Sequence, residues 1–442
     1  MMDSKIIAEA KQIEKKLNLF ITIADKVDGK PIAVKDNICT FNMRTTAGSK
    51  ILHNYIPVFD ATVIAKLKAA GYGIVGKTAM DEFGFGTFST NCAYNIPKNP
   101  WNIERACGGS SGGSAAYVAA SKLCNVALAQ STGGSISCPA SFCGVVGITP
   151  TYGLVSRYGL IDYANSMDKI GVVAKTVKEA SGILSIIAGH DNMDQTSQDV
   201  KKQDYTKFCS DGKLKLKLAV PKEYFTNVDK QVSKSVWEAI EKLEKLGCTY
   251  QEISLPTTKA ALAAYYLIAV AEASTNLAKF CGMRYGLSTD PENKGFNEQF
   301  SEIREQGFGP EAKRRILLGT FARLAGWRDQ YYSRALKVRT KVIEDFKKTF
   351  KKFDAIVAPT MPILPPKFSE IKKLSPAQIY ALDVLTVPAN LAGLPHVSVP
   401  CGLANGLPVG LHLIGDHFAE PKLIQIAHAF EKARGPMKYP RF

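Results

Sequence analysis

The 442-residue sequence contains little that would hold a metal ion or a framework of disulfide bonds. It has only six histidines, and its ten cysteines stand singly, without a C-x-x-C pair or an H-E-x-x-H motif. Zinc sites in proteins usually need cysteines and histidines at short, fixed spacings. Scattered cysteines in a long chain are typical of a reduced intracellular protein with small buried thiols. The sequence therefore predicts neither a zinc site nor disulfide bonds.

A long hydrophobic run is also missing. The longest uncharged apolar stretch, residues 260–271, has twelve residues before Glu272, whereas a helix needs about 20 to cross a bilayer. The first twenty residues contain Asp3, Glu9 and Glu14 and no A-x-A cleavage site. We therefore expect no membrane span, no secretory signal and no transit peptide.

Acidic residues are in short supply, because 40 Asp and Glu face 56 Lys and Arg, which leaves a net charge of +16. Such an excess admits a nucleic-acid partner, since Lys and Arg displace counterions from phosphate. A lysine-rich soluble surface is the simpler explanation. Residues 334–352 place apolar side chains near helical spacing beside many lysines, which predicts an amphipathic helix with one solvated basic face.

Strand-like and helical segments alternate along the chain. The strand-like segments are 31–35, 73–75, 124–130, 215–220, 354–359 and 396–400, and the clearest helical ones are 114–121, 176–189, 229–246 and 420–433. This alternation predicts an α/β fold with a mainly parallel or mixed central sheet. Without repeats or an obvious linker, we expect a single domain over residues 1–442. It would begin with a short helix at about 4–17 and carry a helix-rich cap at about 255–352.

Two short patterns resemble well-known motifs. Residues 71–78 match G-x-x-x-x-G-K-[ST], the phosphate-binding loop, but a helix rather than a strand precedes them, so we favour a helix–turn–strand corner. Residues 108–112 match G-x-S-x-G, the nucleophile elbow, but no apolar strand precedes them. No histidine occurs between His53 and His190 either. A Ser-His-Asp triad is therefore disfavoured, although its histidine could come from downstream.

The region 107–144 is the most unusual part of the sequence, because two Gly/Ser loops flank a small-residue helix and a buried strand. A flexible linker would not enclose a buried strand, so these glycines should allow close packing or expose backbone N–H groups. A serine surrounded by such N–H groups is suited to attacking a carbonyl and stabilising the oxyanion that forms. Purely structural turns are the alternative interpretation.

A serine nucleophile needs a base, and no histidine lies near these loops in the sequence. A lysine kept neutral by burial is one alternative. Lys35 ends the apolar segment 31–35, where its side chain could point into a buried site. The competing interpretation is an ordinary surface lysine at the end of a strand.

The residues PIAVKDN at 31–37 and the Gly/Ser region 107–144 together resemble the amidase signature family. That resemblance implies a mixed central sheet covered by helices on both faces, and a Ser–cis-Ser–Lys triad. By position, Lys35 is the implied base, Ser110 the bridging serine after a cis peptide bond, and Ser135 the nucleophile. The implied oxyanion hole consists of the backbone N–H groups of Thr132, Gly133, Gly134 and Ser135.

Further stretches resemble the glutamine-hydrolysing subunits of tRNA-dependent amidotransferases within this family. They extend over nearly the whole chain and include SRYGLIDYANSMDKIG at 156–171, AGHDNMDQTS at 188–197 and GFGPEAKRRILLGTF at 307–321. The resemblance implies glutamine as the substrate. Arg315 would bind its α-carboxylate and Asp383 its α-ammonium group. One tyrosine of the pair 265–266, for which we choose Tyr265, would line the pocket.

The same resemblance implies partners. The chain would release ammonia for the B-type subunit of the amidotransferase, a kinase and transamidase that converts Glu-tRNA(Gln), and in some enzymes Asp-tRNA(Asn), to the amidated forms. A small C-type subunit would complete the complex, and charged tRNA would bind to the complex. ATP and Mg²⁺ would bind to the partner kinase and transamidase, with no cofactor or metal in this chain. The expected location is the cytoplasm, with the mitochondrial matrix as the alternative.

Two residues of the active loop depart from the usual family pattern, because Ser131 stands where an acidic residue is common and Ser137 where an arginine is common. They put the fine tuning of the site in question rather than the triad. Two other functions stay open. A free-standing amidase acting on another small amide would not need Arg315 or Asp383. A non-catalytic basic RNA-binding protein is the second, but no aromatic-rich RNA-binding motif favours it.

Overall fold

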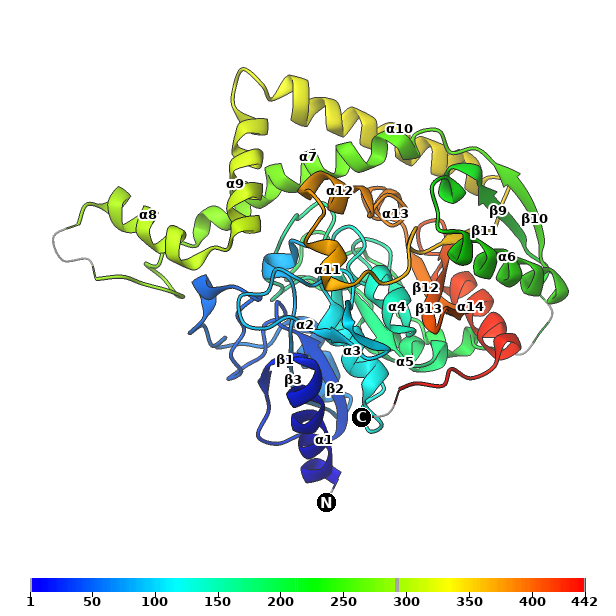
Figure 1. The fold of residues 1–442 in the computed structure, drawn as a ribbon, viewed down its shortest axis with the longest axis horizontal. Coiled ribbons are helices and arrows are strands. Elements are labelled where there is room, and N and C mark those ends of the chain that lie inside the picture. Colours follow the sequence, from blue (N-terminus) through cyan, green and yellow to red (C-terminus); the bar gives the residue numbers. More distant parts are fainter. Residues whose placement is uncertain (1, 211, 213, 291–293, 441) are drawn as a thin grey trace.

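A computed structural model describes residues 2–210, 212, 214–290, 294–440 and 442. Its centre is one mixed sheet of eleven strands in the order β1-β3-β2-β6-β8-β7-β12-β13-β11-β9-β10 (Figure 1). These strands are β1 (Phe20–Ile23), β2 (Lys30–Lys35), β3 (Tyr72–Thr78), β6 (Val126–Ser131), β7 (Val146–Thr149), β8 (Lys169–Ala174), β9 (Lys217–Pro221), β10 (Thr249–Ile253), β11 (Ala355–Pro359), β12 (His396–Ala404) and β13 (Leu407–Ile414). A separate two-stranded sheet consists of β4 (Lys98–Asn99) and β5 (Asn102–Ala106).

Helices cover both faces of the central sheet. The helices are α1 (Met2–Leu17), α2 (Thr62–Ala69), α3 (Gly112–Ala120), α4 (Ser137–Cys143), α5 (Val177–Ile187), α6 (Lys230–Lys245), α7 (Thr258–Asn276), α8 (Phe296–Gly307), α9 (Pro310–Arg323), α10 (Arg334–Phe350), α11 (Phe368–Ile371), α12 (Pro376–Ala381), α13 (Val387–Leu391) and α14 (Glu420–Arg434). One apolar core contains side chains of α2, α5, α6 and α14. A second core, formed with α1 and α3, lies on the opposite face, because alternate residues of β2 and β6 belong to the two cores.

The predicted fold class, a mixed sheet flanked by helices, is confirmed. Each predicted strand and helix named above is present, with ends that differ by a few residues at most. The sequence patterns did not predict β1, β4, β5, β7, β8, β10 or β13, nor the short helices α4, α11, α12 and α13. The helix-rich region 255–352 contains α7 to α10, of which α7, α9 and α10 lie above the sheet in Figure 1.

The sheet brings the two parts of the predicted site together. β2 and β6 are parallel neighbours, with Ala33 opposite Ala127 and Val34 opposite Leu128. Since neighbouring parallel strands end at the same edge of a sheet, Lys35 at the end of β2 lies beside the end of β6. The Thr132–Ser135 loop begins there and leads into α4.

Helix α7 is the one helix in the described part of the chain that is long and apolar enough to cross a membrane by length and composition. It packs against α9, α10 and α13, and 56% of its most apolar window is buried inside the protein. A core helix that is covered on most sides has the same composition. Its packing within the cap region accounts for its apolar character.

Close packing of α9 on α7 depends on Gly319. A Cβ at this position would lie 1.8 Å from the carbonyl oxygen of Val270 and 2.9 Å from Ser274 Cβ, both on α7. We expect Gly319→Ala to force the helices apart and to lower the free energy of unfolding by about 1–3 kcal/mol, as overpacking does. Thermal or urea unfolding measures this change. Gly326→Ala is the matched control, because nothing lies within 4 Å of its Cβ. Equal stability of the two variants would contradict the predicted contact.

Candidate active site

Lys35 is completely buried at the end of β2, so the surface-lysine interpretation is wrong. Its Nζ lies 2.6 Å from Ser110 Oγ, 2.9 Å from the carbonyl oxygen of Gln130 and 3.1 Å from Gln130 Oε1. Burial lowers the pKa of Lys35 to about 7, although the carboxylates of Asp81 and Asp168 oppose this effect. A lysine that is partly unprotonated near neutral pH can accept a proton from a neighbouring hydroxyl group.

Ser110 follows two glycines in left-handed conformations, Gly108 with φ +84° and Gly109 with φ +52°. A Cβ at Gly109 would lie 2.7 Å from Pro139 and 3.0 Å from Ser135 Cα, so only glycine lets the two Gly/Ser loops pack directly together. The described residues contain no cis peptide bond, and the cis bond implied before Ser110 is therefore not found. Here the two left-handed glycines turn the chain through trans bonds.

Ser135 lies at the end of the Thr132–Ser135 loop and is 7% exposed. Asn390 Nδ2 donates a hydrogen bond to the carbonyl of Gly133, and the Cys138 N–H donates to the carbonyl of Gly134 at 2.8 Å. Among the described residues, the N–H groups of Gly133, Gly134 and Ser135 donate to no backbone carbonyl. The structure records no hydrogen bond between Ser110 and Ser135, both of which it describes. The loop thus holds its carbonyls in hydrogen bonds and leaves its N–H groups available for an anion.

A small, narrow cavity reaches Ser135 from the side of the cap. The three residues predicted to bind substrate, which come from α7, α9 and the segment before α13, all line it. The full lining consists of Gly84, Gly86, Gly109, Gly134, Ser135, Tyr265, Tyr266, Arg315 and Asp383. The fold therefore brings a serine, a cation and a carboxylate to one enclosed space.

The guanidinium group of Arg315 is buried among aromatic rings. Its Cζ lies 5.2–5.6 Å from the ring centroids of Phe85, Tyr163, Tyr266 and Tyr380. Arg315 Nε donates to Glu311 Oε1 at 2.8 Å, and Nη1 donates to the hydroxyl of Tyr163. Aromatic faces and one carboxylate stabilise the buried cation, and they hold it in one orientation toward the cavity.

Asp383 presents the negative charge of the cavity. Its Oδ2 accepts hydrogen bonds from Tyr266 Oη at 2.7 Å and from Thr87 Oγ1 at 2.9 Å. Burial raises the pKa of Asp383 to about 6, while these two hydrogen bonds and the charge of Arg315 act in the opposite direction. The carboxylate is therefore ionised above about pH 6.

Both tyrosines of the pair 265–266 line the cavity, in different ways. Tyr266 positions Asp383, as described above. The hydroxyl of Tyr265 lies over the Thr132–Ser135 loop, since a Cβ at Gly133 would be 2.6 Å from it. A glycine is required at position 133 for this close approach. The sequence analysis selected Tyr265 and did not assign a separate place to Tyr266.

The sequence analysis also missed Gln130 and Asp168. Gln130 Nε2 donates to Thr132 Oγ1 at 2.8 Å and to Asp168 Oδ1 at 3.0 Å, and the hydroxyl of Thr132 donates to Asp168 Oδ1 at 2.6 Å. Together with the contacts to Lys35, these bonds join Lys35 to the Thr132–Ser135 loop. One signal was available, because Gln130 is a polar residue at the end of an apolar strand, directly before the Gly/Ser loop.

At the two positions that depart from the family pattern, the side chains of Ser131 and Ser137 form hydrogen bonds with uncharged groups. Ser131 Oγ accepts a long hydrogen bond from Asn390 Nδ2 at 3.5 Å. Ser137, at the start of α4, lies 2.9 Å from Nδ1 of His396, which in turn lies 3.0 Å from Nε2 of His412. Burial lowers the pKa of His396 well below its usual range and that of His412 to about 3. Both imidazoles are therefore neutral near physiological pH.

The two segments that match the phosphate-binding loop and the nucleophile elbow do not form those structures. Residues 71–78 run from the end of α2 along β3, as a helix–turn–strand corner, and Lys77 is buried there, donating to the carbonyl of Ile38. In the G-x-S-x-G segment, Ser110 contacts a lysine rather than a histidine. The described residues contain no group of three or more His, Cys, Asp or Glu side chains that could hold a metal ion.

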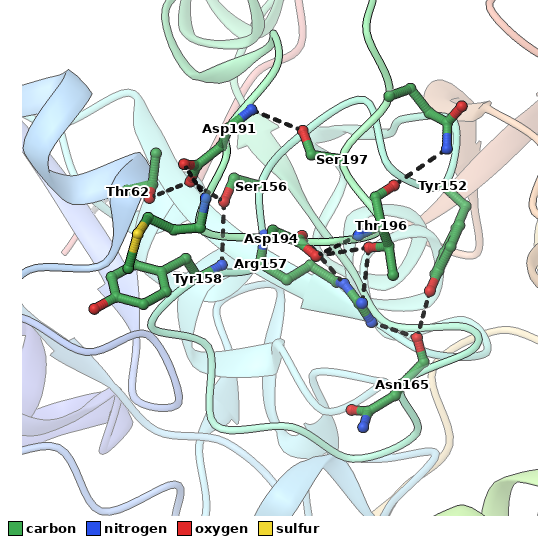
Figure 2. A network of polar contacts seen from close by, with 12 residues as sticks. Thr62, Tyr152, Ser156, Arg157, Tyr158, Asn165, Asp191, Asp194, Thr196 and Ser197 are labelled. Atoms are coloured by element: carbon green, nitrogen blue, oxygen red, sulfur yellow. Dashed lines mark hydrogen bonds and ion pairs between the residues drawn. The ribbon is translucent and has the colours of Figure 1, made fainter.

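Two of the stretches that resemble amidotransferase subunits, 156–171 and 188–197, form a polar network outside the substrate cavity (Figure 2). Asp191 Oδ2 accepts hydrogen bonds from Thr62 Oγ1 at 2.6 Å and Ser156 Oγ at 2.5 Å. The Arg157 N–H donates to Asp194 Oδ2 at 2.8 Å, and the Arg157 guanidinium donates to Thr196 Oγ1 at 2.8 Å. The network fixes the segment that leads to Asp168.

Comparisons with known sequences agree with this arrangement. A sequence model of the family described as amidase matches residues 1–424. The A subunit of glutamyl-tRNA(Gln) amidotransferase from Geobacillus sp. (strain WCH70) is 50% identical over 427 residues, which cover 96% of this chain and 87% of that protein. The protein of the same name from Methanococcoides burtonii is 51% identical over 411 residues, covering 93% of this chain and 86% of that protein.

A solved structure gives the same result. The crystal structure of the glutamyl-tRNA(Gln) amidotransferase A subunit from Thermotoga maritima matches this chain with a TM-score of 0.85 and 41% sequence identity. The match covers 99% of this chain and 93% of that one. With a family match over nearly its whole length and relatives half identical to it, the chain belongs to the amidase signature family.

Proposed function

We propose that this chain hydrolyses the side-chain amide of glutamine and is the amidase subunit of a tRNA-dependent amidotransferase. The observation that carries the proposal is that Arg315 and Asp383, charges of opposite sign, line the same small cavity as Ser135. Free glutamine carries an α-carboxylate and an α-ammonium group, so it needs both partners. The names of the relatives that are about 50% identical support the same function.

The triad acts as a proton relay in this proposal. Neutral Lys35 takes the proton of Ser110, and Ser110 takes the proton of Ser135 as its oxygen attacks the amide carbon of glutamine. Return of the proton along the same path to the amide nitrogen breaks the C–N bond and releases ammonia. The glutamyl ester left on Ser135 is then hydrolysed by water, which the same relay activates, and glutamate is released.

The Thr132–Ser135 loop stabilises the oxyanion. Its N–H groups are already oriented and are not consumed by backbone bonds in the described part of the chain. Preorganised donors of this kind require no rearrangement as negative charge develops, and each one typically contributes about 10²–10³-fold to the rate. On the side of the cap, the hydroxyl of Tyr265 lies against Gly133 and covers the loop.

The proposed partners follow from the chemistry that this chain does not perform. Transfer of ammonia to a tRNA-bound carboxylate requires activation of that carboxylate. We assign this step to a B-type kinase and transamidase subunit that binds ATP and Mg²⁺, with a small C-type subunit in the complex. No cofactor is assigned to this chain. The cytoplasm is the proposed location, in keeping with ten cysteines that are all free thiols.

A free-standing amidase is the second candidate function, since the same relay would cleave other small amides. The charges of the cavity distinguish the two candidates. A simple aliphatic or aryl amide carries no charged group that could pair with Arg315 or Asp383. Burying two such charges is costly unless a ligand or another group pairs with them. Glutamine therefore accounts for more of the site.

Ser135→Ala removes the nucleophile and should lower glutaminase kcat by at least about 10³-fold, as loss of a covalent nucleophile does in other hydrolases. Ammonia release from glutamine, by the chain alone and with its partner subunits, measures the loss. Ser131→Ala is the matched control, because the hydroxyl of this buried neighbour makes a single, long hydrogen bond among the residues that the structure describes. A fully active Ser135→Ala enzyme would rule out the proposed mechanism.

The rate should rise with pH through the pKa of Lys35. Below about pH 7 the amine is protonated and cannot accept a proton, so kcat/KM should fall about tenfold for each unit of pH down to about pH 6, and more steeply below it, where Asp383 is also protonated. Above that value the amine is neutral and the profile should level off. A profile of kcat/KM between pH 5.5 and 9 measures this limb. Activity that falls as pH rises through 7 would contradict a lysine base.

Arg315→Lys and Asp383→Asn should weaken glutamine binding and change chemistry less. Each loses a charge-assisted hydrogen bond to the substrate, so KM should rise about 10–100-fold with a smaller change in kcat. Steady-state kinetics with glutamine, beside a simple aliphatic amide of the same length, separate these effects. An unchanged KM for glutamine in both variants would favour the free-standing amidase.

A further inference from the structure

We propose that Gln130 is a positioning residue that directs the lone pair of Lys35 toward Ser110, and that Asp168 locks the Gln130 amide in the required orientation. This inference rests on the proposed function, because it assigns Lys35 the role of base. The nitrogen in question is Lys35 Nζ, which is buried and lies within hydrogen-bonding distance of Ser110 Oγ and of two oxygens of Gln130.

The three neighbours of Lys35 Nζ have unequal chemistry. Two are oxygens of Gln130, the main-chain carbonyl at 2.9 Å and Oε1 at 3.1 Å, and both can only accept hydrogen bonds. The third is Ser110 Oγ at 2.6 Å, which can donate or accept. A neutral amine has two N–H groups and one lone pair. When both N–H groups donate to Gln130, the lone pair lies toward the hydroxyl of Ser110.

This arrangement requires Oε1, and not Nε2, of Gln130 to face Lys35. Nε2 has two protons, and both are used elsewhere: one is donated to Thr132 Oγ1 at 2.8 Å and one to Asp168 Oδ1 at 3.0 Å. Asn37 Nδ2 donates to Oε1 at 3.3 Å. If the Gln130 amide were flipped, its NH₂ group would face the N–H donors of Lys35 and Asn37. Its oxygen would then face the carboxylate oxygen of Asp168, which can only accept. One orientation is therefore strongly favoured.

Asp168 is itself held in place. Its Oδ2 accepts hydrogen bonds from the backbone N–H groups of Tyr163, at 2.8 Å, and Ala164, at 3.0 Å. The segment that carries it begins at the polar network of Arg157 and Asp194 (Figure 2). The orientation of Gln130 thus depends on a carboxylate with no freedom to turn, and the base is coupled to the oxyanion loop through Thr132.

Other charged groups act on the same nitrogen. The carboxylates of Asp81, before the turn that leads to Gly84, and Asp168, before β8, both favour the protonated form of Lys35. Arg315 of α9 acts on Asp81, and Arg157 and Asp162 act on Asp168. Gln130 is uncharged, so its oxygens orient the amine and favour the ammonium form only weakly. A carboxylate at position 130 would lack that property.

Two substitutions at position 130 should move the pH profile in opposite directions. In Gln130→Met the oxygen Oε1, which stabilises the ammonium form of Lys35, is lost, so the apparent pKa in kcat/KM should fall. The plateau value of kcat should drop about 10²-fold, because the lone pair of Lys35 is no longer directed toward Ser110. Gln130→Glu places a carboxylate beside Lys35, and the apparent pKa should rise by at least about one unit. KM for glutamine should change little in both variants, since Gln130 does not line the cavity.

Asp168→Asn tests the lock. An asparagine cannot accept from both Gln130 and the backbone donors, so the amide at 130 loses its fixed orientation and kcat should fall about as far as in Gln130→Met. The double variant should be no slower than the slower single variant, because both act through one nitrogen. Asp28→Asn is the control, since it removes an exposed carboxylate that pairs with Lys26.

The measurement is the pH dependence of kcat and KM for glutamine in the complete amidotransferase, with folding of each variant checked by circular dichroism. Opposite pKa shifts with a non-additive double variant would support the proposal. Unchanged kcat and pKa in Gln130→Met, with Ser135→Ala inactive, would overturn it and leave the proposed function intact. Equal pKa shifts of one sign in Gln130→Met and Gln130→Glu would also overturn it. A Ser135→Ala enzyme that stays active would instead contradict the function itself.

Discussion

Burial of the Lys35 amine is the constraint on which the rest of the site depends. An ammonium group has high affinity for water, so complete enclosure at the end of β2 favours the neutral form and lowers the pKa to about 7. Enclosure also demands partners for every remaining polar atom. Gln130 and Ser110 supply them from β6 and from the loop before α3. The parallel pairing of β2 with β6 is what makes these partners available at one edge of the sheet.

The proposed recognition of substrate depends on buried charge in the cap region. A guanidinium group inside a protein is costly unless its surroundings replace water. Four aromatic rings and Glu311 surround Arg315, and two hydroxyl groups donate to Asp383. Both charges are therefore fixed before any ligand arrives, at positions set by α9 and by the segment before α13. Arg315 and Gly319 belong to the same helix, α9, so the close packing of Gly319 on α7 helps to set the position of Arg315.

Sequence patterns were sufficient for the strands and helices with clear periodicity, whereas Lys35, Ser110 and Ser135 were proposed as a triad from the resemblance to the amidase signature family. Strands such as β8 and β13 were missed because their apolar runs, buried on both faces, show no alternation that separates strand from helix. The roles of Gln130 and Asp168 depend on hydrogen bonds across 38 residues of sequence, and no local pattern reports such contacts. The cis bond before Ser110 came from resemblance alone, and the two left-handed glycines make another turn there.

The loop that carries Ser135 has an unusual electrostatic setting that follows from two of its neighbours. Serines occupy positions 131 and 137, and the histidines beyond Ser137 are neutral because burial lowers their pKa values. The charges that act most on Lys35 are those of Asp81 and of Asp168, and Asp168 also accepts a hydrogen bond from the hydroxyl of Thr132 in the loop. A fixed cation next to the loop would stabilise an oxyanion, but it would also hold bound anions after reaction. In the proposed mechanism the N–H dipoles of the loop provide that stabilisation, so the rate should depend strongly on the geometry of residues 132–135.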